Sequence, residues 1–449
     1  MTDPTRKTLF QLSFPLFLHS MVTLAVMVLD TMIFSAHSAA AATSLSIAGP
    51  ILRVAFELST MIGLGGVILI SNRLGAGDHQ GAALAAEVAI LANSVLGLLI
   101  SIGLAVLGPW VVSFMSMPAD IAKDAVLYLY LAGSAMLFHG FGNAAVSCLR
   151  GYGASRTVLV LGVFGAVLFL TLEYVLILGA GPIPALGVLG SGLSNVIMRT
   201  VVALVLAIVV VRQLRLSLRV RVMLAEWGMI RRIVNLSFPS VSDYIAYGFY
   251  QIILLGLISS FGSVAVLSRA YVMIAMTFLT LVIMALSQGN EVMIGYQRGA
   301  RDLARAYAQA WRSTFWATGL ATGLAVGLWL GADPFVGLFT DDPEVKELSQ
   351  RLLLLTILLQ PGFAFNMILF HALRAIGDVR WPVVVGQGLT WGMSLPLAWF
   401  LCSPMGYGVE GIWYAMIAEE CAKAVVMSWR WVRKMHPSAR AAPPVEPAM

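Results

Sequence analysis

Four polar residues fall at a similar depth in apolar stretches of the first half of the chain: Asp30, Glu57, Glu173 and Asn195. A charge inside a hydrocarbon layer costs several kcal/mol, so acids in such stretches are candidates for function. Burial favours the protonated form of a carboxyl group, and a second carboxyl group nearby favours it further. The four residues therefore predict a site that takes up a proton or another cation, with Asp30 and Glu173 as its charged members. A structural hydrogen-bond network is the alternative.

The composition indicates that these stretches are membrane-spanning helices. The chain has 449 residues, of which 59% are hydrophobic and 11% are charged. In soluble proteins about a quarter of all residues are charged. The apolar runs are about 20 residues long, which suits a helix that crosses a bilayer, and they do not alternate as in a β-barrel. The net charge of +6 comes from basic residues clustered in particular loops and does not indicate nucleic-acid binding. The three cysteines lack metal-site spacing, so no cofactor is expected.

Twelve spans are expected, which predicts an all-α polytopic membrane protein. They lie near residues 11–35, 46–71, 83–107, 123–147, 157–179, 187–211, 236–258, 265–292, 309–330, 349–372, 382–402 and 411–430. Lysine and arginine concentrate at both ends of the chain and in every second loop, so both termini are expected to be cytoplasmic. The chain divides into an N-lobe (1–211), a basic interfacial linker helix (212–235), a C-lobe (236–434) and a disordered cytoplasmic tail (435–449).

The two halves repeat one another. Residues Leu12–Pro15 recur unchanged as Leu236–Pro239, and further matches share this offset of 224 residues. Six spans in each half keep the same orientation, so two six-helix bundles are expected, related by a pseudo-two-fold axis along the membrane normal. Secondary transporters have this architecture and handle substrate between the two lobes. Asp30 has no counterpart in the second half, because the same offset leads to Leu254.

The motifs resemble those of multidrug and toxic compound extrusion (MATE) transporters. The residues that carry the resemblance are, in chain order, Pro15 with Asp30-Thr31, Gly75–Asp78, Leu149–Arg156, Gly187–Gly190, Leu338–Val345 and Leu373–Asp378. The resemblance covers residues 9 to 432. It implies a multi-pass antiporter of the bacterial cytoplasmic (inner) membrane, surrounded by lipid and acting as a monomer. Such a protein exports amphipathic organic compounds in exchange for protons or sodium, by rocking of two bundles.

The resemblance also implies roles for individual residues. In the branch that includes the DNA-damage-inducible bacterial members, the N-lobe cation site would be formed by Asp30 and Glu173. That branch has an asparagine one turn before the second acid, where this chain has Phe169. The missing neutral ligand favours a proton, and sodium at the two acids stays open. Glu57 and Asn195 are assigned to the same site, although Arg53 lies one turn from Glu57 and can neutralise it instead.

A second group of polar residues lies on one face of the seventh span. Asp243, Tyr247, Tyr250 and Gln251 follow one another at positions i, i+4, i+7 and i+8. A carboxylate beside aromatic rings suits an organic cation, so these residues are predicted contacts of the substrate. Packing of the tyrosine rings against neighbouring helices is the alternative.

Arginines and prolines inside the spans are also assigned. Arg53 and Arg269 either pair with acids such as Glu57 or bind an anionic or zwitterionic substrate, and Arg53 is included in the predicted substrate cavity. Pro15 and Pro239 remove a helix hydrogen bond, so they are predicted bending points that link cation binding to movement.

Other acids are interpreted as structural. Glu291 falls near the end of a span and is predicted to be a wetted helix terminus. Glu419 and Glu420 share a helix with Lys423 at helical spacing and predict an internal ion pair.

Two other classes of function remain to be weighed. A lipid-linked precursor flippase of the same superfamily usually has extra spans and a cationic cavity, so twelve spans argue against it, while Arg53 and Arg269 leave some room. A membrane-embedded enzyme needs a nucleophile with a base or a metal cluster. The six histidines are scattered and no HxxxH or GxSxG motif occurs, so no enzymatic activity is expected.

Overall fold

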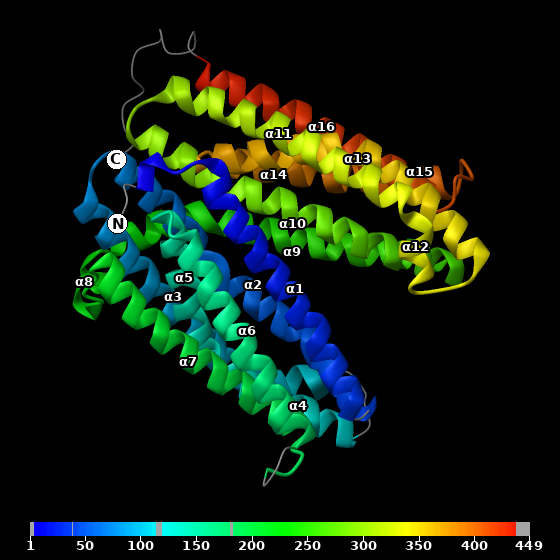
Figure 1. Ribbon diagram of the computed structural model, residues 1–449, viewed down its shortest axis with the longest axis horizontal. Helices are drawn as coiled ribbons and strands as arrows, with labels where there is room; N and C mark the ends of the chain where they lie inside the picture. Colours follow the sequence, from blue (N-terminus) through cyan, green and yellow to red (C-terminus); the bar gives the residue numbers. More distant parts are fainter. Residues whose placement is uncertain (1–3, 38, 114–118, 180–182, 437–449) are drawn as a thin grey trace. The chain divides into compact units, whose positions relative to one another are not determined.

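The computed structural model describes residues 4–37, 39–113, 119–179 and 183–436, and nearly all of them are helical. Most of the tail predicted to be disordered, residues 437–449, lies outside this part. The helices of the first half are α1 (Leu9–His37), α2 (Ala39–Gly75), α3 (His79–Ser113), α4 (Ala119–Ser134), α5 (Met136–Gly151), α6 (Ser155–Leu178), α7 (Val188–Leu214) and α8 (Val220–Ala225) (Figure 1).

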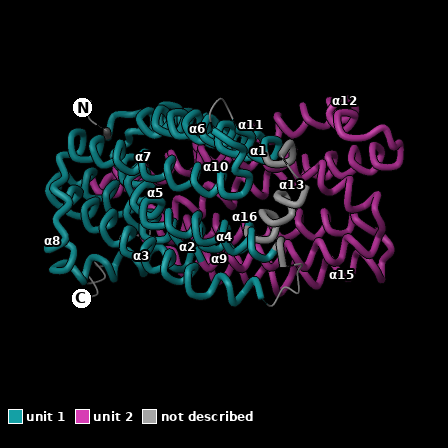
Figure 2. Tube along the Cα trace, turned by 90° about the horizontal axis from the view of Figure 1, so that it is seen from below, with its two compact units in different colours: residues 1–241 teal, residues 242–449 magenta. Residues whose placement is uncertain are grey.

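The second half begins with α9, and its helices follow the order of the first half. They are α9 (Trp227–Ser259), α10 (Ser263–Gly299), α11 (Leu303–Leu330), α12 (Ala332–Gly337), α13 (Pro343–Ala375), α14 (Arg380–Leu389), a π-helical turn (Thr390–Ser394), α15 (Leu395–Cys402) and α16 (Glu410–Met435). Figure 2 colours the two compact units into which the chain divides, unit 1 up to Val241 and unit 2 from Ser242 onwards.

The predicted twelve spans in two six-helix bundles are confirmed. Among the described residues, nine helices are long and apolar enough to cross a membrane, and α4 with α5 forms a tenth span bent by 46°. The eleventh runs from α14 through the π-helical turn into α15, each piece being short by itself. The twelfth is α16, whose apolar character is lowered by Glu419, Glu420 and Lys423.

The basic segment 212–235 does not form the single linker helix that was predicted. Helix α7 continues to Leu214, residues 215–219 are not helical, and α9 begins at Trp227. The backbone turns because Arg215 and Leu218 adopt positive φ angles of 55° and 48°, a conformation that a right-handed helix does not contain. Residues 215–219 are called the α7–α8 strap below.

The α7–α8 strap is fixed to α3 at its centre. The backbone N–H and the hydroxyl group of Ser217 both donate to Oε1 of Glu87, at 2.6 and 2.8 Å. The neighbouring Leu216 is buried. These contacts replace the backbone hydrogen bonds that a continuous helix would have made.

The packing of α1 and α7 against α6 positions the polar residues of unit 1. Helix α1 runs along α6, and the ring of His19 lies against Gly162 so closely that a Cβ atom there would collide with it. Helix α7 touches the end of α6, where a Cβ atom on Gly190 would overlap the carbonyl oxygen of Leu176. Small residues at both crossings let the backbones approach, as is common between membrane helices.

Candidate functional site

Glu173 of α6 is fully buried in unit 1 and is held by a residue of α7. Its exposed fraction is 0%, and the hydroxyl group of Ser191 donates to Oε1 of Glu173 at 2.7 Å. Ser191 directly follows Gly190, where the two helices meet. The hydrogen bond satisfies one oxygen of a carboxyl group that would otherwise be costly to bury.

Asp30 of α1 lies beside Glu173. Oδ1 of Asp30 and Oε2 of Glu173 are both buried, and neither oxygen has a hydrogen-bond partner among the described residues. Two neighbouring carboxyl groups in a low dielectric repel each other when both are ionised. The pair is therefore suited to hold one proton or one monovalent cation.

Asn195 and Tyr128 extend this group across α7 and α4. Nδ2 of Asn195 donates to the hydroxyl oxygen of Tyr128 at 3.4 Å, and Oδ1 of Asn195 accepts from Nε of Arg199 at 3.3 Å. Tyr128 lies within electrostatic reach of Asp30, of Glu173 and of Arg199. The structure thus brings together three of the four predicted cation-site residues. We call Asp30, Tyr128, Glu173, Ser191, Asn195 and Arg199 the unit 1 polar cluster.

Arg199 supplies a positive charge to this cluster. Its guanidinium group lies over the ring of Phe56, 4.4 Å from the centroid, and its Nη1 atom is buried without a hydrogen-bond partner among the described residues. The ring of Phe56 also contacts His139. The cluster thus contains one guanidinium group and two carboxyl groups, and Tyr128 lies within electrostatic reach of all three.

Glu57, the fourth predicted cation-site residue, is not part of the unit 1 polar cluster. It is half-buried on α2, and the charged group near it is Arg53, one turn earlier on the same helix. Arg53 itself is exposed. This arrangement matches the alternative in which Arg53 neutralises Glu57.

The unit 1 polar cluster offers few neutral oxygen ligands for sodium. The position one turn before Glu173 is occupied by the buried ring of Phe169. The hydroxyl group of Ser191 already donates to Glu173, and the side-chain oxygen of Asn195 already accepts from Arg199. Sodium prefers a shell of several oxygen atoms as a hard cation, so the donors available fit a proton better.

The polar face predicted on the seventh span divides into two groups in unit 2. In the first, Tyr247 is partly exposed and accepts a hydrogen bond from Nε2 of Gln251 at 2.7 Å. Arg269 of α10 donates to Oε1 of Gln251 at 2.8 Å. Asp243 accepts from Nε2 of Gln387 on α14 at 2.6 Å. These contacts give Arg269 an amide partner and Asp243 a neutral donor.

Tyr250, in contrast, is fully buried inside unit 2 (0% exposed). Its hydroxyl group lies 2.7 Å from Oγ of Ser394, in the π-helical turn, and 3.4 Å from Oε2 of Glu419. The prediction that it contacts substrate would require this packing to open. For this residue the structure matches the alternative of ring packing.

Glu419, Glu420 and Lys423 form the internal ion pair that was predicted. Nζ of Lys423 lies 2.6 Å from Oε1 of Glu419 and 3.7 Å from Oε1 of Glu420. Asn366 of α13 donates to Glu420 at 2.9 Å, and Thr390 of the π-helical turn donates to Glu419 at 2.6 Å. All three charged groups are thus hydrogen-bonded within unit 2, as buried charges must be.

Glu291 is not the wetted helix terminus that was predicted. It is buried (1% exposed), with Nδ1 of His371 at 3.0 Å from Oε2 and Nη2 of Arg374 at 3.3 Å from Oε1. Its partners lie on α13, some 80 residues further along the chain, where the sequence gives no sign of contact with α10.

Pro15 and Pro239 lie inside α1 and α9, and both helices continue through them. Their predicted role in bending is a property of movement and stays a prediction.

The sequence itself assigns the family. The family model described as MatE matches residues 15–175 and, a second time, residues 239–400. The chain belongs to the MatE family. The second match begins 224 residues after the first, at residue 239 against residue 15, which is the offset of the internal repeat. The predicted family is thereby confirmed.

Bacterial proteins described as transporters or multidrug resistance proteins match this chain over most of their length. The chain is 29% identical over 436 residues to "Uncharacterized transporter YisQ" of Bacillus subtilis, covering 96% of this chain and 95% of that protein. It is 26% identical over 377 residues to "Probable multidrug resistance protein NorM" of Xylella fastidiosa, covering 83% and 80% of the two chains. Both descriptions are of transport or drug resistance, and neither is of an enzyme.

Solved structures with the same fold support the two-bundle architecture. A multidrug resistance MATE family transporter of the MOP superfamily in an outward-facing conformation has a TM-score of 0.83 at 18% identity, with 96% of each chain covered. A MOP superfamily transporter from Pyrococcus furiosus, described as having a binding pocket of reverse polarity, has a TM-score of 0.86 at 17% identity, with 98% of each chain covered. At these identities the likeness establishes the fold alone.

Proposed function

We propose that this MatE protein is a secondary active exporter of amphipathic organic compounds, driven by the inward movement of protons through the unit 1 polar cluster. The observation that carries the proposal is the neighbouring pair of Asp30 and Glu173, each with one buried oxygen that lacks a hydrogen-bond partner among the described residues. A buried polar atom without a partner costs free energy, so the pair has a physical reason to take up a proton.

The proton would be taken up from outside and released to the cytoplasm. When both carboxyl groups are ionised, the two negative charges exceed the single positive charge of Arg199, so the unit 1 polar cluster has one net negative charge. One proton removes the excess, and its release restores the repulsion between the two acids. Occupancy of the pair can thus favour one conformation over another, which is what coupling requires. Alternating access by rocking of the bundles, with bending of α1 at Pro15, is the proposed movement.

Several further features belong to this proposal. The scarcity of neutral ligands around Phe169 supports a proton over sodium. Multidrug relatives support an organic substrate, for which Tyr247, Gln251, Asp243 and Arg53 are the proposed contacts.

Bacterial relatives and the loop charges support a location in the inner membrane with both termini in the cytoplasm. A monomer is sufficient for this mechanism. A lipid-linked precursor flippase gains no support from the relatives named above.

The test is efflux of a fluorescent organic cation from proteoliposomes under separately imposed pH and sodium gradients. Efflux is expected to follow the pH gradient, and Asp30→Asn is expected to abolish it while the purified protein keeps its thermal stability. Glu57→Gln is the matched comparison, because it removes an acid of the same unit that lies outside the cluster, and it is expected to keep most of the activity. Unchanged pH-driven efflux by Asp30→Asn would refute the carboxyl switch, and efflux driven by sodium alone would refute the proton.

A further inference from the structure

A basic pocket lies at one end of unit 1, away from the unit 1 polar cluster. Its volume is about 630 Å³, and it is lined by Thr157 of α6, by Arg212 and Gln213 of α7, and by Arg215 of the α7–α8 strap. Neither arginine forms an ion pair among the described residues, and both are exposed. Two guanidinium groups, an amide and a hydroxyl group therefore converge on one open space.

The backbone that carries these groups is fixed. Leu214 and Leu216, on either side of Arg215, are buried in unit 1. The next residue, Ser217, is bound to Glu87 of α3 by two hydrogen bonds. No ion pair joins Glu87 to Arg215 among the described residues. Because Leu214 and Leu216 are buried, the backbone and Cβ atom of Arg215 are held in place. Less conformational entropy is therefore lost when Arg215 binds a ligand.

The start of α6 adds to the positive potential of the pocket. No side chain caps this helix, since its N-cap residue is Ala154. The first N–H groups of a helix carry a partial positive charge that attracts anions, and Thr157 belongs to this first turn. Lys7 and Arg156 lie close to each other at the same end of the bundle, so the surrounding field is also positive.

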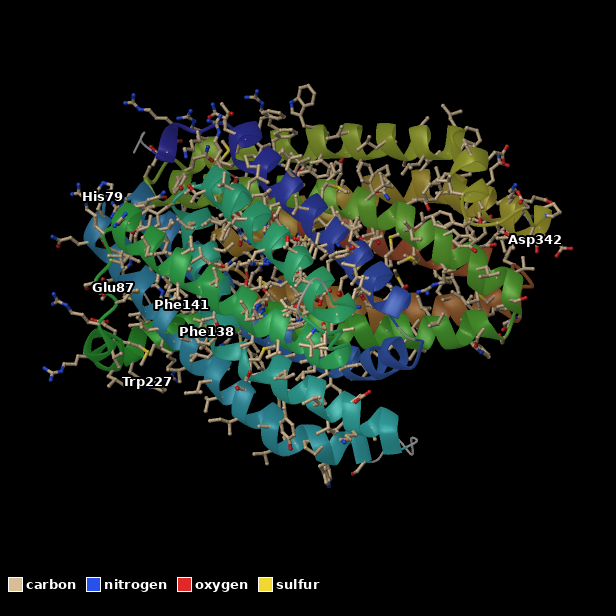
Figure 3. All side chains as sticks on the ribbon, turned by 60° about the horizontal axis from the view of Figure 1, so that its bottom comes forward. His79, Glu87, Phe138, Phe141, Trp227 and Asp342 are labelled. Atoms are coloured by element: carbon tan, nitrogen blue, oxygen red, sulfur yellow. The ribbon has the colours of Figure 1, made fainter. Side chains whose placement is uncertain are left out.

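Exposed apolar residues follow the α7–α8 strap directly in the chain. Val220 and Leu224 of α8 are 57% and 69% exposed, and Trp227 at the start of α9 is 69% exposed. Figure 3 shows Trp227 at the same end of unit 1 as Glu87. Tryptophan beside arginine is typical of the boundary between lipid headgroups and acyl chains. We therefore expect this end of unit 1 to lie at the depth of lipid phosphates.

We propose that the pocket lined by Thr157, Arg212, Gln213 and Arg215 binds the phosphate headgroup of an anionic membrane lipid. Arginine pairs bind phosphate oxygens through bidentate hydrogen bonds, and the amide and hydroxyl groups supply neutral donors for the remaining oxygens. The acyl chains would extend past Leu224 and Trp227, which favours a lipid over a free phosphate ion. This site is separate from cation coupling and does not depend on the proposed function.

The test is native mass spectrometry of the full chain in detergent during titration with phosphatidylglycerol. The pocket variant is Arg212→Gln with Arg215→Gln. The control is Arg231→Gln with Arg232→Gln, which removes the same charge from two exposed residues of α9. Wild type and control are expected to bind the first lipid equally well. The pocket variant is expected to bind it at least about fivefold more weakly, because charge-assisted contacts are lost.

Two further arms make the result decisive. Arg212→Lys with Arg215→Lys keeps the charge but loses the bidentate geometry, so this variant is expected to bind the lipid with intermediate affinity. It replaces the glutamine variant in the comparison if that variant does not fold. An excess of inorganic phosphate is expected to leave the bound lipid in place. Equal binding by the pocket variant and the control would overturn the site. Displacement of the lipid by inorganic phosphate would overturn the lipid as its ligand.

Discussion

The hydroxyl group of Ser191 donates a hydrogen bond to Oε1 of Glu173 at 2.7 Å, from α7 to α6, with both side chains buried. The remaining oxygen of Glu173 has no such partner among the described residues. One oxygen of the carboxyl group is thus held in place by the fold, while the other oxygen is the one at which we propose that a proton binds. The position of α7, which carries Ser191, determines which oxygen of Glu173 is hydrogen-bonded.

Ser191→Ala is expected to lower pH-driven efflux by about tenfold, because removing a donor to a charged group costs roughly 1.5–3 kcal/mol. Ser191→Thr, which keeps the hydroxyl group, is expected to retain most activity. Ser194→Ala is the control, because the hydroxyl group of Ser194 is also buried on α7 but donates only to the backbone oxygen of Gly190. Initial rates in proteoliposomes measure the effect. Equal loss in both alanine variants would mean that the α7 serines act only through stability.

Phe169→Asn is expected to give the exporter a response to sodium. The substitution places an amide oxygen one turn before Glu173, where the buried ring of Phe169 now excludes a neutral ligand. Efflux driven by a sodium gradient is not expected in the wild type and should appear in this variant. Phe169→Leu removes the ring without adding an oxygen, so it should not gain the response. Sodium-driven efflux of the same size in both variants would show that the ring excludes sodium by its volume alone.

Arg374→Met is expected to destabilise unit 2 by about 3–5 kcal/mol, because it leaves the buried Glu291 with half of its ion pairing. Arg374 is 1% exposed and lies 3.3 Å from Glu291. Adding Glu291→Gln to this variant should recover part of the loss, since the uncompensated charge is then removed. Thermal unfolding in detergent measures both variants. Additive losses would show that the two side chains stabilise the protein independently.

Stability is also expected to depend on pH through Lys7, at the start of the chain. Burial lowers the pKa of Lys7 below its ordinary value of 10.5, and Arg156 lowers it further. The unfolded chain therefore binds this proton more tightly, so stability rises with pH between the lowered pKa and 10.5. Thermal unfolding at about pH 8 and about pH 10 should show a smaller rise in Lys7→Gln than in the wild type. An equal rise in both would assign the slope to other groups.

The fold follows from regularities that a sequence displays directly. Length and hydropathy locate the spans, and the repeat of Leu12–Pro15 at Leu236–Pro239 locates the two bundles. The hydropathy of a span depends on that helix alone, and the repeat is found by comparing the chain with itself, so neither requires knowledge of tertiary contacts. The α7–α8 strap was mispredicted because its arginines do have helical spacing. What ends the helix is a tertiary contact, the pair of hydrogen bonds from Ser217 to Glu87.

The candidate site was predictable in part. Counting residues from the membrane surface placed Asp30 and Glu173 at one depth, and the structure places them side by side. Ser191 was missed, although it precedes Asn195 by one helical turn, and that spacing was the available signal. Tyr128 was also missed, because nothing in the sequence places α4 against α7. Glu57 was grouped by depth alone, which does not say which way a side chain points.

The position that matches Asp30 in the repeat is occupied by Leu254, which is 1% exposed in the apolar core of unit 2. A duplicated protein with identical halves would respond to an ion gradient in the same way on both sides. Here the first helix of one half carries a titratable group at this point, and the first helix of the other half carries hydrocarbon. The two bundles share one arrangement of helices but differ in charge at this register position, so a cation would find a carboxyl group in one bundle and only hydrocarbon at the matching point of the other.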